Sequence, residues 1–198
     1  MDLERVRTVV LAGGRSRRMG FDKLTADFAG EPLVRRVARA LAPLHPLLIA
    51  TPAVASAVRD VDGLEVIETD PTAGIAATLQ LADRAVARDL YLAVLPCDMP
   101  FVDAARVRAF AGRVADDADV AWPVVAGVPG HPVVWSPAAR ARIAALPPDA
   151  APLRVRDDAA LRAVAFDERD DAYVTDVDTP AAWAAALERD RRARSATG

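Results

Sequence analysis

Two groups of residues in this sequence have types and spacings suited to binding, respectively, phosphate and a metal ion. The first is LAGGRSRRMGFDK, residues 11–23, which places a glycine pair before three arginines and Lys23. Lys23 is the single lysine among the 25 basic residues of the 198-residue chain. Backbone N–H groups left accessible by glycine, together with nearby positive charge, bind phosphate groups well. The stretch therefore predicts a polyphosphate-binding loop.

The loop differs from two common nucleotide-binding motifs, because neither G-x-x-x-x-G-K-[ST] nor G-x-G-x-x-G occurs in it. A solvated surface loop with ordinary arginines is the alternative interpretation. The loop directly follows a predicted buried strand at residues 6–12, and open α/β sheets bind ligands at the carboxyl ends of their strands. An ammonium is a compact point charge, so Lys23 suits a position between phosphates that a broad guanidinium would not.

The second group consists of aspartates that follow later predicted strands. Asp98 lies between two prolines in LPCDMP, and Mg²⁺ favours one or two carboxylates plus substrate phosphates. Asp98 is therefore the predicted Mg²⁺ ligand. Asp176 and Asp178 share one side of a predicted last strand. Because Asp178 could instead cap the following helix, Asp176 is the better second ligand, and capping by both aspartates is the alternative.

Three other residues carry weaker signals. Asp70 follows the third predicted strand and could contact a nucleobase or ribose, or only open a turn. With only His45 and His131 in the chain, a histidine metal site is not expected. Cys97 has no partner histidine at a suitable spacing, which disfavours a role as nucleophile.

Length and composition predict a single globular domain over residues 1–198, with a charged tail at 189–198 that frays. Hydrophobic residues make up 53% of the chain and charged residues 27%. A net charge of −3 gives no global basic field, so no nucleic-acid partner is expected. One cysteine, no signal peptide and no apolar run of about 20 residues predict a cytoplasmic protein without a membrane contact.

Alternating strands and helices position these residues. The pattern predicts strands at 6–12, 47–50, 66–68, 90–95, 120–123, 133–135, 164–166 and 173–177. It predicts helices at 32–42, 75–87, 104–115 and 137–146, near Leu161, and from Pro180 onward. This order predicts an α/β fold, a Rossmann-like three-layer sandwich with a mainly parallel, mixed central sheet.

The sequence resembles the MobA-like nucleotidyltransferases, and among them most closely the molybdenum cofactor guanylyltransferases. The resemblance covers most of the chain and rests on five stretches: LAGG with RMG and DK at 11–23, GEPL at 30–33, Asp70 with Gly74-Ile75, PCDMP at 96–100, and DVDTP at 176–180. It implies a nucleotide-diphospho-sugar transferase-like fold. It also implies transfer of GMP from GTP to the phosphate of molybdenum-molybdopterin, with Mg²⁺ and release of pyrophosphate.

The resemblance implies roles for residues at the carboxyl edge of the sheet. The backbone of Leu11, Ala12 and Gly13 would contact guanine, with Gly14 in the same nucleotide-binding loop. Thr51, after the second strand, aligns weakly with a further nucleotide contact.

The remaining implied roles are electrostatic. Lys23, with Arg15 or Arg18, would neutralise the triphosphate and stabilise the departing pyrophosphate. Asp70 would contact the nucleotide, and Asp98 would hold Mg²⁺ and so also belongs to the nucleotide site. The expected partners are GTP, a molybdopterin-type phosphate acceptor and, transiently, molybdenum cofactor proteins.

Two departures from the family pattern bear on the choice of nucleotide. Residues 71–75 read PTAGI where guanylyltransferases of the family often have GPLAGI, and GHPV at 130–133 is more similar to the sister cytidylyltransferases. Those enzymes usually carry Ala-Gly at the position of Gly13-Gly14 and lack the Asp before Lys23. GTP is therefore favoured over CTP. The sequence is also compatible with a non-catalytic nucleotide-binding module or with a transferase for another small phosphate.

Overall fold

The computed structural model describes residues 2–13, 19–114 and 117–196. Over these residues the central sheet has eight strands, seven of them in the order β10-β7-β9-β6-β1-β4-β5, with β8 paired to β7. β9 is antiparallel to both of its neighbours, whereas β1 is parallel to β4 and β6. The bounds are β1 Val6–Ala12, β4 Leu47–Ala50, β5 Glu65–Glu68, β6 Tyr91–Pro96, β7 Val120–Val125, β8 Val128–Pro129, β9 Val133–Trp135 and β10 Ala163–Glu168. A separate hairpin pairs β2 (Asp27–Phe28) with β3 (Glu31–Pro32).

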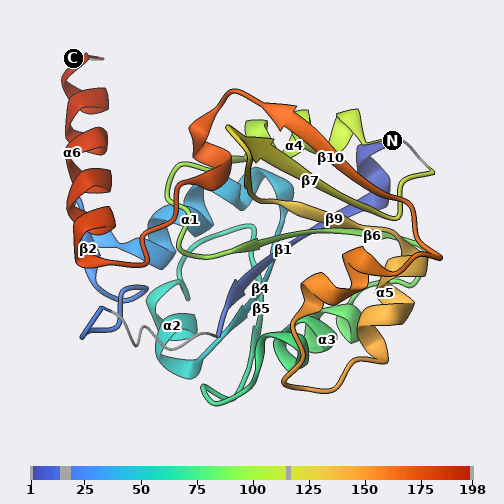
Figure 1. The fold of residues 1–198 in the computed structure, drawn as a ribbon. Helices are drawn as coiled ribbons and strands as arrows, with labels where there is room; N and C mark the ends of the chain where they lie inside the picture. The colour runs from blue at the N-terminus through green and yellow to red at the C-terminus, as the bar shows by residue number, and fades with distance from the viewer. Residues whose placement is uncertain (1, 14–18, 115–116, 197–198) are drawn as a thin grey trace.

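Helices cover both faces of this sheet (Figure 1). Side chains of α3 and α5 pack on one face, and those of α1, α2 and α4 pack on the other. The helices are α1 Leu33–Leu41, α2 Pro52–Ala57, α3 Ile75–Ala85, α4 Ala104–Arg113, α5 Pro137–Ala144 and α6 Pro180–Ala196. The predicted three-layer sandwich with a mixed, mainly parallel sheet is confirmed.

The central strands are buried because both of their faces carry apolar side chains. Along β1, Val9 packs with α3 and α5, and Val10 packs with the helices of the opposite layer. Successive side chains of a strand point to opposite faces, so a strand between two helical layers is apolar throughout. β4 shows the same pattern, with all four of its residues buried.

Local capping fixes where several helices begin. The Asp103 carboxylate accepts a hydrogen bond of 2.9 Å from the backbone N–H of Arg106 at the start of α4. The Thr179 hydroxyl accepts one of 3.1 Å from Ala182 N–H at the start of α6. Both starts agree with the predicted ones, since such caps satisfy N–H groups that the first helical turn leaves unpaired.

Two predicted elements are wrong, and one helix was missed. The predicted strand at 173–177 is a 3-10 helix at Asp171–Val174 followed by extended chain. The predicted helix near Leu161 is absent from the described chain, and a 3-10 helix lies earlier, at Pro152–Asp157. α2 was not predicted, because its six residues are too few to show helical periodicity.

Most of the charged tail predicted to fray lies in α6, which continues to Ala196. Glu188 accepts hydrogen bonds of 2.9 Å from Arg191 and 2.7 Å from Arg192, one turn along the helix. Arg194 donates to Asp190 at 2.7 Å, and Asp190 also pairs with Arg36 of α1. Ion pairs at i,i+3 and i,i+4 spacing support the helix, and the contact with Arg36 anchors it to the domain.

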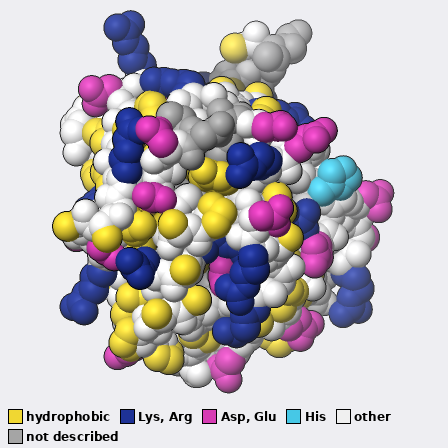
Figure 2. Space-filling model, turned by 90° about the vertical axis from the view of Figure 1, so that its right-hand side faces the viewer, with side chains coloured by type: hydrophobic (Ala, Val, Ile, Leu, Met, Phe, Trp, Pro, Cys, Tyr) yellow, Lys and Arg dark blue, Asp and Glu magenta, His cyan; other side chains and the backbone are white. Residues whose placement is uncertain are grey.

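The surface carries charges of both signs. Figure 2 shows basic and acidic side chains interspersed with hydrophobic ones over one face of the molecule. Across the described residues, no helix combines the length and the apolar character needed to cross a bilayer.

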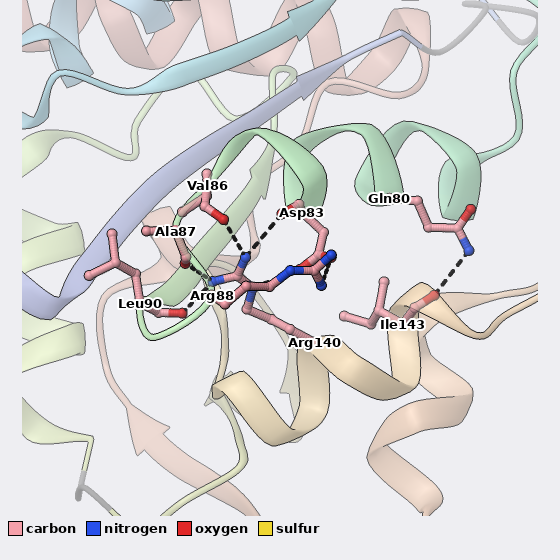
Figure 3. A network of polar contacts seen from close by, with 8 residues as sticks. All are labelled: Gln80, Asp83, Val86, Ala87, Arg88, Leu90, Arg140 and Ile143. Carbon is pink, nitrogen blue, oxygen red and sulfur yellow. Dashed lines mark hydrogen bonds and ion pairs between the residues drawn. The ribbon is translucent and has the colours of Figure 1, made fainter.

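A buried ion pair joins α3 to α5 (Figure 3). Arg140 of α5 is 1% exposed, and its Nε donates to Asp83 Oδ1 of α3 at 2.7 Å. Its other N–H groups donate to the carbonyls of Asp83, Val86, Ala87 and Leu90, at the carboxyl end of α3 and just beyond it. The guanidinium therefore caps α3, where backbone carbonyls lack partners within the helix.

Candidate functional site

A cavity of about 510 Å³ lies at the carboxyl ends of β1 and β6. Leu11 and Gly13 line it from β1, and Pro96 and Asp98 from β6 and the loop that follows. Ile75 and Thr78 contribute from the start of α3. The cavity thus occupies the sheet edge where open α/β folds bind ligands.

Lys23 forms the charged centre of this cavity. Its Nζ lies 2.5 Å from Asp98 Oδ2 and also makes an ion pair with Asp178 Oδ1. The three side chains come from the loop after β1, the loop after β6 and the segment before α6. Two carboxylates and one ammonium sum to a net charge of −1 in a site that is mostly shielded from solvent.

The electrostatics of the site keep Lys23 charged. Burial lowers the pKa of the ammonium, but attraction to Asp98 and hydrogen bonds to Asp178 and Asp98 outweigh it, so the pKa lies above its ordinary value. A fixed positive charge in a shielded cavity is strongly stabilising for a phosphate.

Packing outside the cavity holds these charges in place. Trp183 of α6 makes edge contacts with Phe21 and Phe28, at ring-centroid distances of 5.6 and 5.2 Å. Phe21 lies two residues before Lys23, and Trp183 five residues after Asp178. The aromatic contact therefore couples the loop that carries Lys23 to the helix that follows Asp178.

Asp98 retains an oxygen with unused bonding capacity. Its Oδ1 is buried and has no hydrogen-bond partner among the described residues. The Val177 N–H donates to the Asp98 carbonyl at 3.0 Å, which fixes Asp176 and Asp178 on either side of this contact.

Across the described residues, no group of three or more His, Cys, Asp and Glu side chains is placed to hold a metal ion. Two carboxylates and an unpaired oxygen fit a Mg²⁺ ion that takes its other ligands from substrate phosphates and water.

Gly13 marks a close approach at the β1 end of the cavity. A Cβ atom there would lie 2.9 Å from Cγ2 of Thr69 and 3.5 Å from Oγ1 of Thr78. A side chain at this position would displace Thr69 and press against Thr78. Packing against Thr69 therefore accounts for a glycine at this position, and the predicted close approach of a ligand to its backbone stays a prediction.

Pro129-Gly130-His131 and residues of the segment at 173–176 also line the cavity. The His131 N–H donates to the Tyr173 carbonyl at 2.8 Å, and a Cβ at Gly130 would lie 2.1 Å from the same oxygen. Burial lowers the pKa of the His131 imidazole, so the ring is neutral at pH 7. The cavity lining thus includes an uncharged imidazole as well as the Lys23 ammonium.

The structure brings together a large part of the predicted site. Leu11, Gly13, Lys23, Asp98 and Asp176 all line the cavity. Of the two aspartates before α6, Asp178 makes an ion pair with Lys23, and the hydroxyl of Thr179 caps α6. The choice of Asp176 as second metal ligand stays a prediction.

Other predicted residues lie away from the cavity or outside the described chain. The Ala12 side chain is buried in the core, and its contact, predicted through the backbone, stays a prediction. Thr51 precedes α2 without lining the cavity. Asp70 also does not line it and accepts hydrogen bonds of 2.6 Å from the N–H and hydroxyl of Thr72, which closes a turn. The predicted contacts of Gly14, Arg15 and Arg18 fall on residues that the structure does not describe.

Cys97 is unsuited to act as a nucleophile, although it lies next to Asp98. The thiol is buried, and burial together with the charge of Asp98 raises its pKa far above neutrality. A protonated, inaccessible sulfur is a poor nucleophile.

Thr78, His131 and Tyr173 line the cavity but were not assigned to it from the sequence. Thr78 lies one turn inside α3, where an isolated hydroxyl gives no signal. The unusual Gly130-His131-Pro132 triplet was the available clue for His131.

Comparison with known proteins decides the family. The model of the MobA-like NTP transferase domain matches residues 8–164, which is most of the chain and reaches from β1 into β10. The chain belongs to this family. The match includes Asp98 and also the loop that follows β1, and it ends before the segment at 176–178.

Curated relatives agree over part of their length. The chain is 38% identical over 113 residues to a probable molybdenum cofactor guanylyltransferase of Haloferax mediterranei, covering 54% of this chain and 53% of the relative. It is 40% identical over 102 residues to the molybdenum cofactor guanylyltransferase of Pseudomonas putida, covering 48% and 51%. The chain thus spans about half the length of the curated relatives it matches.

Solved structures agree over nearly the whole chain. Rv0371c of Mycobacterium tuberculosis H37Rv is 28% identical with a TM-score of 0.74, covering 92% of this chain and 97% of that one. A crystal structure of Rv0371c in complex with manganese matches with 25% identity and a TM-score of 0.71, covering 92% and 98%. Molybdopterin-guanine dinucleotide biosynthesis protein A of Archaeoglobus fulgidus, at 20% identity and a TM-score of 0.75, covers 94% and 99% and shares the fold.

Proposed function

We propose that this protein is a nucleotidyltransferase that moves GMP from GTP to the phosphate of molybdenum-molybdopterin and releases pyrophosphate. The observation that carries this proposal is the Lys23 ammonium held by Asp98 and Asp178 in a cavity at the carboxyl ends of β1 and β6. The names of the curated relatives support the choice of guanine and of the acceptor.

The cavity has two walls suited to two substrates. The nucleotide would lie against Leu11, Gly13 and Lys23, where the backbone is open to close approach. The acceptor would enter beside Pro129, Gly130 and His131, with Asp98 between the two. This placement puts the reacting phosphates next to Lys23.

The reaction needs no side chain that removes a proton. The acceptor is a phosphate monoester with a second pKa of about 6, so it is mostly dianionic at pH 7. The obstacle is repulsion between two anions that must approach in line. Lys23 would screen this repulsion and stabilise charge on the departing pyrophosphate, with Arg15 or Arg18 supplying further positive charge.

Asp98 would hold Mg²⁺, with Asp176 or Asp178 as the second carboxylate. When bound, Mg²⁺ would neutralise phosphate charge and orient the triphosphate. The manganese complex of Rv0371c supports the use of a divalent metal. In this structure the Asp98 carboxylate also holds the Lys23 ammonium.

Pyrophosphate release with Mg²⁺ and each of the four nucleoside triphosphates, with and without molybdopterin acceptor, tests the proposal. GTP-dependent release that requires the acceptor is expected. Absence of release with every triphosphate would refute catalysis and leave a non-catalytic nucleotide-binding module.

One observation favours a second candidate, a cytidylyltransferase that makes the CMP form of the cofactor. His131 belongs to the GHPV stretch that resembles those enzymes, and its side chain lines the cavity. Turnover with CTP and not with GTP in the same assay would select this candidate.

A further inference from the structure

Lys23 lies where a divalent cation that bridges Asp98 Oδ2 and Asp178 Oδ1 would lie. Its Nζ contacts one oxygen of each carboxylate, and its side chain is only 10% exposed. The proposed reaction needs both a metal on Asp98 and the Lys23 ammonium on the triphosphate. One ammonium cannot remain between the carboxylates while a metal ion takes the same oxygens.

We propose that Lys23 is an exchangeable internal counter-ion, which holds Asp98 and Asp178 in the nucleotide-free protein and moves to the triphosphate when metal and nucleotide bind. This inference rests on the proposed function, because it uses the same site. It goes further in predicting that metal and nucleotide binding are linked through one side chain.

Charge balance gives the reason for the linkage. If Lys23 left alone, two like charges would remain close together in a shielded site, which is unfavourable. If a metal ion entered alone, it would have to displace the ammonium from both carboxylates. When both ligands bind, the metal neutralises the carboxylates and the phosphates neutralise Lys23. Such coupling is reciprocal, so each ligand raises the affinity for the other.

A second cation in the chain supplies a matched control. Arg106 also lies between two aspartates, with Nη1 2.6 Å from Asp103 Oδ2 and Nε 2.8 Å from Asp170 Oδ2. Neither aspartate nor Arg106 lines the cavity. Removing the charge of Arg106 therefore changes net charge by the same amount as removing that of Lys23, without emptying the site.

The first test measures Mn²⁺ binding without nucleotide by electron paramagnetic resonance of the free ion. It compares the wild type with Lys23→Met and Arg106→Met. We expect Lys23→Met to bind Mn²⁺ on the order of tenfold more tightly than the wild type, a typical coupling magnitude, and Arg106→Met to match the wild type. A Lys23→Met affinity no higher than that of Arg106→Met would overturn the proposal.

The second test uses the unaltered protein and does not depend on a variant folding. Because Lys23 is the single lysine of the sequence, ¹⁵N-lysine labelling gives one side-chain ammonium signal. We expect Mg²⁺ alone to shift this signal, with the same midpoint at which it displaces Mn²⁺ from the protein. A signal unchanged at saturating Mg²⁺ would overturn the proposal.

The outcome is separable from that of the proposed function. Lysine exchange with Mg²⁺ but no turnover with any triphosphate would refute the proposed reaction alone. Turnover with GTP and a Lys23 signal that ignores Mg²⁺ would refute the counter-ion exchange alone.

Discussion

Two regions of this molecule each shield a cation beside carboxylates, and they differ in how completely the hydrogen bonds are satisfied. At Arg140, all five N–H groups of the guanidinium have acceptors: one oxygen of Asp83 and four backbone carbonyls (Figure 3). At Lys23, the neighbouring Asp98 keeps a buried oxygen without a hydrogen-bond partner among the described residues.

The difference teaches how to separate structural from functional charges in one chain. A satisfied buried network leaves nothing for a ligand to bind, and its removal exposes an uncompensated charge. An unsatisfied oxygen beside a cavity has capacity for another cation. The Arg140 cluster should therefore respond to mutation through stability, and the Lys23 site through activity.

The largest effect is expected at the Lys23 site. Asp98→Asn keeps the size of the side chain but removes the charge that would hold Mg²⁺ and fix Lys23. Pyrophosphate release should fall by about a thousandfold or more, with thermal unfolding close to that of the wild type. Activity within tenfold of the wild type would remove Asp98 from the metal site and weaken the comparison.

The next effect is expected at the Arg140 cluster and has the opposite signature. Arg140→Met fills similar space but leaves Asp83 and four carbonyls short of donors, at a cost of about 3–5 kcal/mol in the free energy of unfolding. Urea unfolding measures this loss, while turnover per folded molecule should be retained.

Arg142→Met on the same helix is the matched control for that variant. Arg142 pairs with Asp158 at a side-chain exposure of 54%, so its loss should cost less than about 1 kcal/mol. Equal destabilisation by the two variants would show that burial of the Arg140 network contributes nothing.

A charge-preserving change sharpens the comparison. Lys23→Arg keeps a positive charge but replaces a compact ammonium by a broader planar group, whose charge cannot occupy the same point between Asp98 Oδ2 and Asp178 Oδ1. Steady-state kinetics should show turnover lowered by about a hundredfold, as for a catalytic group displaced by about 1 Å. Undiminished turnover would mean that only charge, and no geometry, matters at this position.

The smallest effect is expected at a third, more exposed cluster. Burial raises the pKa of Asp170, but the Ala172 N–H and Arg106 outweigh it and lower the pKa below its ordinary value. The folded state therefore gains stability from ionised Asp170 above the unfolded pKa of about 3.9, and loses it as the pH falls through the lowered pKa.

Asp170→Asn should accordingly lower the free energy of unfolding by less than about 1 kcal/mol at pH 7. Urea unfolding at a series of pH values should show this difference shrinking as the pH falls below about 4. A difference that grows in acid would contradict the direction of the pKa shift.

The sequence predicted the parts of this fold that depend on local chemistry. β1, β4 and β9 have the predicted bounds, and Asp103 and Thr179 cap the helices that follow them. Apolar runs and capping residues act over a few positions, so a single sequence reveals them. The same holds for the loop after β1, whose glycine and charges lie within one stretch.

The prediction for the segment at 173–177 was wrong because its partners are distant in sequence. Its Tyr, Val and Thr residues suit a strand, yet it makes single hydrogen bonds, from His131 to the Tyr173 carbonyl and from Val177 to the Asp98 carbonyl. No ladder forms, so propensity alone gives the wrong element. The choice of Asp176 over Asp178 relied on alternation along this predicted strand, which the structure does not contain. The contact of Asp178 with Lys23 joins residues 155 positions apart, so no local pattern in the sequence reveals it.

Gly130 has a consequence for how this architecture can diverge. Since a Cβ there would overlap the Tyr173 carbonyl at 2.1 Å, the position tolerates no side chain while the chain crosses at this point. A related chain with any other residue there must route its last crossover differently. That crossover leads directly into Asp176 and Asp178. A glycine at this position in another sequence therefore indicates that an acidic pair can lie at the same place in its fold.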